Sequence, residues 1–151
     1  MTSPKHKKPS FNQQFVDAKT AKISPRANPD RFLDRSPSWR IARLELCDPF
    51  GWHACSETEF RTIHERLKAF ETMTWKDILN APNARNHFIQ VSALGKPARD
   101  RVEALGLDVD ELMSLRVSQK QRIFGVMVEE VCQLLFWDPE HQVYPMNIAD
   151  N

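Results

Sequence analysis

Residues 112–144, LMSLRVSQKQRIFGVMVEEVCQLLFWDPEHQVY, form the densest apolar stretch of the chain. This stretch contains three runs of aliphatic, aromatic and β-branched residues, at 112–117, 122–128 and 131–137. The polar breaks between them, 118–121 and 129–130, are short enough to be hairpin turns. We therefore expect a three-stranded antiparallel meander that leaves through the turn Asp138-Pro139-Glu140-His141.

The composition is that of one globular domain. A chain of 151 residues is long enough for one hydrophobic core, and 41% hydrophobic with 27% charged residues is close to the globular average. No apolar run approaches the roughly 20 residues that span a bilayer, and the N-terminus lacks the apolar segment of a secretory signal. Three cysteines without framework spacing favour a reducing compartment, so we expect a cytoplasmic protein with no membrane segment.

Charge divides the chain into two parts. Residues 1–40 carry nine Lys or Arg against three Asp, whereas residues 41–151 carry twelve against seventeen Asp or Glu. Residues 1–38 are rich in Pro, Lys, Ser and Asn and lack sustained periodicity, which predicts a flexible, disordered basic arm. This arm is either a solubilising tail or a contact for RNA or a partner protein. Residues 39–151 are then a single α+β domain.

Local patterns predict the remaining elements. Residues 39–47 mix alternation with apolar content and are typical of a first strand, and residues 87–91 are typical of a short one. Capping boxes at Ser56 and Thr74 predict helices over 57–70 and 75–80, and Pro97 with Gly106 brackets a helix over 96–105. The first helix carries one apolar stripe, which we expect to pack on the sheet: Phe60, Ile63, Leu67 and Phe70. Strands grouped at the end of the chain favour α+β, with helices packed on one face of an antiparallel sheet.

Four residues near the first helix have the side chains of a zinc site: Cys47, His53, Cys55 and His64. Their spacing lacks the paired knuckle that makes such patterns specific. Buried thiols and ordinary histidines are the favoured interpretation, so we assign no metal and no cofactor, with zinc as the alternative. Cys132 lies in an apolar strand, where desolvation would raise its pKa and disfavour a nucleophile.

Side chains suited to phosphate chemistry gather around the end of the meander: Arg116, Lys120, Arg122, His141 and Tyr144. Arginines on a sheet face can hold a phosphate, while histidine and tyrosine can transfer protons. The alternative is structural: edge charges, a turn-forming Asp-Pro and a tyrosine that packs on the sheet.

The segment QRIFGVMVEEVCQLLFWDPEHQVY, residues 121–144, resembles the C-terminal half of the RelE/ParE-like toxin fold. Arg122 matches the arginine that opens a strand in that family, and residues 131–136 match its aliphatic strand. His141 matches the later basic position, and Val143-Tyr144 match the ending. The helix expected over 57–70 is similar to the family's N-terminal helix, laid against the sheet.

This resemblance implies a small bacterial endoribonuclease that cleaves messenger RNA, often on the ribosome, and is restrained by an antitoxin protein. Arg122, His141 and Tyr144 would be catalytic, and Arg116 and Lys120 would bind the substrate. Convergence of these side chains in one concavity would favour this reading.

The alternative function is a non-catalytic protein-interaction module of mobile-element or phage origin. Its binding surface would be the sheet face that bears Phe124, Phe136 and Trp137.

Overall fold

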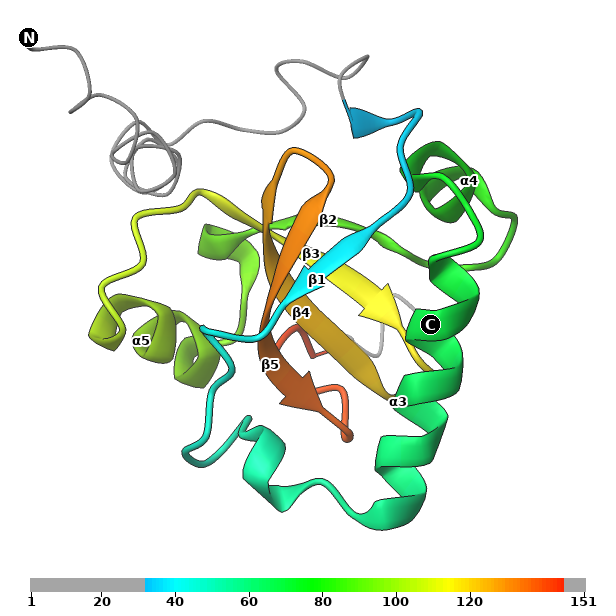
Figure 1. Ribbon diagram of the computed structural model, residues 1–151. Helices are drawn as coiled ribbons and strands as arrows, with labels where there is room; N and C mark the ends of the chain where they lie inside the picture. Colours follow the sequence, from blue (N-terminus) through cyan, green and yellow to red (C-terminus); the bar gives the residue numbers. More distant parts are fainter. Residues whose placement is uncertain (1–31, 146–151) are drawn as a thin grey trace, which may run out of the picture.

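The predicted meander forms the centre of a five-stranded sheet. β3 (Glu111–Arg116), β4 (Arg122–Val128) and β5 (Val131–Asp138) pair antiparallel in succession. The strand order is β1-β5-β4-β3-β2 in this computed structural model, which describes residues 32–145 (Figure 1). The α+β class with a C-terminal meander is confirmed.

The two outer strands come from the first half of the described chain. β2 (His87–Gln90) pairs antiparallel with β3, whereas β1 (Ser38–Arg40) pairs parallel with β5, so the sheet is mixed. The predicted strand over residues 39–47 is wrong beyond Arg40. There the chain turns, with the Leu44 N–H donating to the Ile41 carbonyl at 3.1 Å, and no longer follows β5 as a regular strand.

The helices begin and end close to where their caps predict. α3 (Glu57–Phe70) and α4 (Trp75–Asn80) both open with complete capping boxes, from Ser56 with Glu59 and from Thr74 with Asp77. α5 (Lys96–Ala104) has proline in its first turn and is followed by Gly106 at φ 70°. Two short 3₁₀ helices, η3 (Trp52–Ala54) and η4 (Val91–Ala93), complete the elements.

Both faces of the sheet are covered. α3 and α4 pack on one face through Ile63, Phe70, Trp75 and Ile78, as expected. α5 packs on the opposite face (Figure 1), where Ala98 and Val102 meet a second apolar cluster. The expectation of helices on one face alone therefore needs this correction. Helices cover both faces because successive residues of the central strands point to opposite faces and are both apolar, as are Leu112 and Met113.

A bulge in β5 sets which side chains face α5. Phe124 pairs with Phe136 but Gly125 pairs with Leu134, so Leu135 is an extra residue in β5. Beyond it the alternation is shifted by one position. Phe136 thus joins the cluster on the α5 side, and Trp137 joins the core under α3.

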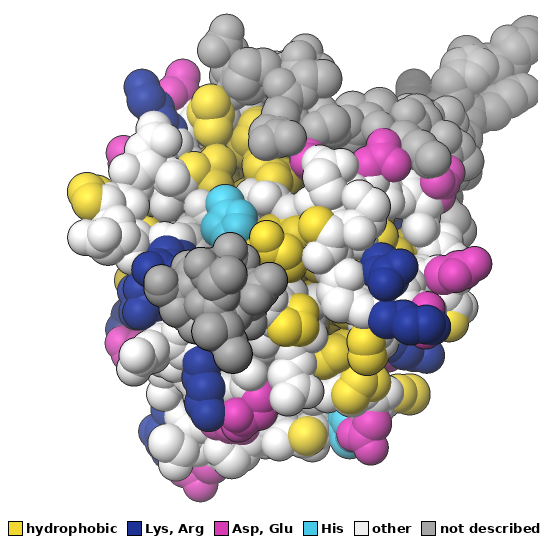
Figure 2. Space-filling model, turned by 180° about the vertical axis from the view of Figure 1, so that it is seen from behind, with side chains coloured by type: hydrophobic (Ala, Val, Ile, Leu, Met, Phe, Trp, Pro, Cys, Tyr) yellow, Lys and Arg dark blue, Asp and Glu magenta, His cyan; other side chains and the backbone are white. Residues whose placement is uncertain are grey.

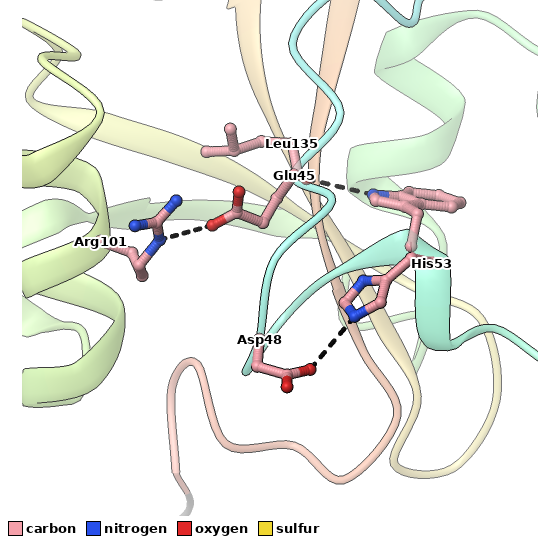
Figure 3. Close-up of polar contacts among 6 residues, drawn as sticks. Glu45, Asp48, His53, Arg101 and Leu135 are labelled. Atoms are coloured by element: carbon pink, nitrogen blue, oxygen red, sulfur yellow. Dashed lines mark hydrogen bonds and ion pairs between the residues drawn. The ribbon is translucent and has the colours of Figure 1, made fainter.

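The bulge also anchors the segment that follows β1. The Leu135 carbonyl accepts from the Glu45 N–H at 2.8 Å and from Trp52 Nε1 at 3.1 Å. Glu45 is 4% exposed and forms an ion pair with Arg101 of α5 at 2.5 Å (Figure 3). This irregular segment therefore covers the β5 edge where β1 ends.

Burial corrects the predicted stripe on the first helix. Ile63 and Phe70 are buried and Leu67 is half-buried, but Phe60 is 60% exposed. Only a narrow row of α3 meets the sheet, and the first turn of the helix carries Phe60 into solvent.

The aromatic face assigned to a protein-interaction module is core instead. Phe124, Phe136 and Trp137 are each no more than 1% exposed. Trp75 is also fully buried, and Trp39 and Trp52 pack against the same core. Phe124, Phe136, Trp137 and Trp75 are buried because helices cover both faces of the meander, so these four rings offer no surface to a partner.

The folded domain begins earlier than residue 39. Phe32 is 1% exposed and packs edge-on against Phe88, with ring centroids 6.4 Å apart. The carbonyls of Leu33 and Arg35 accept from the first N–H groups of α4. Residues 32–38 are therefore part of the body rather than of a flexible arm, and residues 1–31 of the predicted arm lie outside the described residues.

Candidate phosphate-binding pocket

Two cross-strand rows on the α5 side of the sheet form the floor of the candidate site. One row runs through His87, Ser114 and Phe124, which are direct partners on β2, β3 and β4. The next row runs through Arg116, Arg122 and Asp138. Residues two apart on a strand share a face, so the rows lie side by side.

A small pocket of about 60 Å³ opens above this floor. It is lined by Arg85, His87, Ser114, Arg122, Phe124, His141 and Tyr144. The structure thus brings together Arg122, His141 and Tyr144, which the sequence singled out. It leaves Arg116 and Lys120 outside the lining.

Arg122 is held by the hairpin that precedes it. Arg122 is only 6% exposed, and its Nη1 atom donates to the carbonyls of Ser118, Gln119 and Gln121 at 2.9, 3.1 and 3.0 Å. Nε and Nη2 make no hydrogen bond within residues 32–145. Burial lowers the pKa of Arg122, and the positive charges of Arg116 and Arg85 lower it further, while Asp138 opposes the shift. Positive charge is therefore crowded around the pocket.

Arg116 and Lys120 have other contacts. The Arg116 guanidinium donates to the carbonyls of Ser118 and Asn83, at 3.2 and 3.1 Å, and so joins the hairpin to the loop before β2. Lys120 forms an exposed ion pair with Glu140 at 2.7 Å. Neither residue lines the pocket.

Arg85 and His87 are the residues that sequence reasoning missed. Arg85 lies in the loop between α4 and β2 with φ 60°, as does Asn83. Asn86 fixes this loop, because its buried amide donates to the Ile78 carbonyl at 3.2 Å and accepts from the Arg116 N–H at 2.8 Å. Asn83 and Asn86 in the sequence indicate a tight loop, since Asn is common in turns and tolerates the positive φ that Asn83 adopts. Nothing local indicates that Arg85 points toward β4.

The turn after β5 positions His141. Asp138 is 1% exposed, and its carboxylate accepts from the N–H groups of Gln142 and Val143 at 2.9 and 2.7 Å. His141 adopts φ 61° within this turn, and its Nδ1 atom is buried without a partner among the described residues. Burial raises the pKa of Asp138, and the backbone hydrogen bonds and His141 counteract this. Val143 is fully buried and secures the far end of the turn.

The pocket combines two guanidinium groups, two imidazoles and two hydroxyls around a space of about 60 Å³. The guanidinium groups have the charge and the donor geometry that bind a phosphate group. Imidazole side chains can act as general acids or bases. The geometry suits recognition of a single phosphate and proton transfer at its oxygens.

The four candidate zinc ligands do not converge. His53 Nε2 lies 3.2 Å from Asp48 (Figure 3), and His64 is on the exposed face of α3 beside Glu65. Within the described part of the chain, no group of three or more His, Cys, Asp or Glu is arranged to hold a metal ion. Burial raises the pKa of the Cys132 thiol to about 12, as its place in an apolar strand predicts.

The surface around the molecule has mixed charge. Figure 2 shows Lys and Arg side chains standing beside Asp and Glu side chains, without one continuous basic field on that face. Residues 41–151 also carry a net negative charge. Attraction of an anion is therefore local to the pocket rather than spread over this face.

Comparisons with known proteins do not add a family. No protein-family model, curated protein or solved structure matches the chain. No helix among residues 32–145 is long and apolar enough to cross a membrane.

Proposed function

We propose that this protein is a toxin-like endoribonuclease of a toxin–antitoxin module and that it cleaves messenger RNA at the described pocket. The observation that carries the proposal is the convergence of Arg85, His87, Arg122, His141 and Tyr144 in one small concavity. The partners implied are an antitoxin protein and messenger RNA, with the ribosome as the place of cleavage.

The arginines would bind the scissile phosphate. Arg122 leaves Nε and Nη2 for a ligand, since its described hydrogen bonds all come from Nη1. Arg85 lines the same pocket, and the charges of Arg85 and Arg116 disfavour the protonated form of Arg122. An RNA phosphate would relieve this repulsion, and more so as negative charge develops on its oxygens during cleavage.

The imidazoles and Tyr144 would move the protons. A base removes the proton of the ribose 2′-hydroxyl, whose oxygen then attacks phosphorus, and an acid protonates the leaving 5′-oxygen. His141 and His87 line the pocket from opposite elements, the turn after β5 and strand β2. Two histidines in one pocket can share these tasks, one as the base and the other as the acid.

The test combines growth with RNA integrity. Expression of the intact chain should arrest bacterial growth, and the purified chain should cleave messenger RNA in a translating extract. His141→Ala and Arg85→Ala should each lower cleavage by about 10²-fold or more, because each removes a proton-transfer or charge-stabilising group.

Matched controls lie far from the pocket on the exposed face of α3. His64→Ala and Arg61→Ala remove the same side-chain types and should retain wild-type cleavage, since the ion pair of Arg61 within residues 32–145 is with Glu57 on the same helix. If the intact chain is harmless and leaves RNA whole in the extract, the enzyme proposal fails.

A non-catalytic interaction module is the second candidate. The observation that favours it is the exposure of large apolar side chains away from the pocket: Ile41 at 68%, Leu46 at 60% and Phe60 at 60%. In that case a partner would bind the intact chain, and the pocket variants would have no effect on its affinity.

A further inference from the structure

A second, wider cavity opens where β1 meets the start of β5. It has a volume of about 300 Å³ and is lined by Arg40, Ala42, Arg43 and Gln133. Arg40 and Gln133 are direct partners in the parallel ladder, so their side chains share one side of the sheet. Gln133 is five residues before Asp138 on β5, which separates this cavity from the phosphate pocket by roughly 15 Å.

Arg43 is oriented by a buried amide. Gln133 is 4% exposed, and its Oε1 accepts from Arg43 Nε at 2.6 Å. The two terminal nitrogens of the Arg43 guanidinium have no partner among the described residues. An arginine held in this way presents two N–H donors whose spacing matches that of the two oxygens of a carboxylate.

The acidic side chains nearest in sequence are engaged elsewhere. Glu45 turns inward to Arg101, and Asp48 is paired with His53 (Figure 3). Among the described residues, neither carboxylate is paired with Arg43.

The same segment exposes two aliphatic side chains. Ile41 and Leu46 are 68% and 60% exposed, on either side of Arg43 in the sequence. A free phosphate would make no use of them. A peptide that carries both carboxylate and aliphatic side chains would cover them and also pair with Arg43.

We propose that the cavity at the β1–β5 edge, where Gln133 orients Arg43, forms a docking site together with Ile41 and Leu46, which are exposed on the segment after β1. The ligand would be an acidic, leucine-rich peptide segment of a partner protein. Its carboxylate would bind Arg43 end-on, and its aliphatic side chains would pack on Ile41 and Leu46. This site is independent of the phosphate pocket, and both can be occupied together.

The probe is a capped six-residue peptide that alternates glutamate and leucine, titrated into the full-length chain while the Arg43 Nε–Hε signal is followed by NMR. The expected result is a saturable shift of that signal and of the backbone amides of residues 41–46. Arg43→Ala and Gln133→Leu should each weaken binding about tenfold or more, since a charge-assisted hydrogen-bond pair is lost or disoriented. Arg61→Ala, an exposed arginine on α3, is the matched control and should retain the affinity.

Three results would overturn the proposal. The first is equal binding of the same peptide with glutamine in place of glutamate, and the second is wild-type affinity of Arg43→Ala. The third is a tighter, competing shift of the Arg43 signal by a short RNA strand, which would make this a nucleic-acid site. The His141→Ala variant should bind the peptide normally, so failure here is distinct from failure of the ribonuclease proposal.

Discussion

Arg122 shows how one residue serves both the fold and the proposed site. Its Nη1 atom organises the hairpin carbonyls, and the rest of its guanidinium lines the pocket. Removal of Arg122 would therefore disturb the hairpin as well as the candidate pocket. Arg85 and His141 are better probes of chemistry, because fewer backbone groups depend on their side chains.

Asp138 gives a pH-dependence at the same scale. Burial raises its pKa above the usual value, so the folded protein binds this proton more tightly than the unfolded chain. The resulting contribution to stability is fully present below about pH 4 and is lost as the pH rises through the raised pKa. The free energy of unfolding of Asp138→Asn, measured with urea, should therefore fall less steeply with rising pH over this window than that of the wild type.

The control for this measurement is Asp100→Asn, at an exposed carboxylate paired with Lys96. In this variant the free energy of unfolding should change with pH as steeply as in the wild type. An Asp138→Asn protein with an unchanged slope would show that burial of this carboxylate does not govern the titration.

At the scale of elements, α3 contributes through a narrow face. Ile63 is 2% exposed, whereas Phe60, three residues earlier on the same helix, is 60% exposed. Ile63→Ala should lower the free energy of unfolding by about 2–5 kcal/mol, because it leaves a cavity under the helix. Phe60→Ala should change it by less than about 0.5 kcal/mol. Chemical denaturation of the two variants decides this, and equal losses would contradict the orientation of α3.

At the scale of the whole molecule, the start of the domain can be tested by truncation. Phe32 fills the core between β2 and the α4 side, so a chain that starts at residue 39 lacks this ring. Its melting temperature should lie on the order of 10 °C below that of a chain that starts at residue 32. Calorimetry of both chains measures this difference, and equal melting temperatures would return the boundary to residue 39.

The charge of the whole molecule predicts the salt dependence of RNA binding. If RNA binds only through the proposed pocket, with one phosphate held there, few counterions are released on binding. The slope of log affinity against log salt should be about −1 or shallower, since each neutralised phosphate of a single strand contributes about −0.7. Fluorescence titration with a short RNA measures the slope. A slope several times steeper would show that a broad basic surface takes part.

The sequence by itself determined the features that depend on neighbouring residues. The meander, the two capping boxes and the helix bounded by Pro97 and Gly106 follow from patterns within a few positions, and all are confirmed. The grouping of Arg122, His141 and Tyr144 was also accessible, because all three lie on one hairpin and its exit turn.

Only the tertiary structure decided which distant residues meet. The extra residue Leu135 in β5 turns Phe136 toward α5, and no local signal marks it. Arg85 enters the pocket because Asn86 ties its loop to Ile78 and Arg116, and Phe32 is buried because it meets Phe88 across the fold. These arrangements depend on strand register and on contacts between segments far apart in the chain. Local propensity carries no information about either, because a shift of one residue exchanges the faces of a strand.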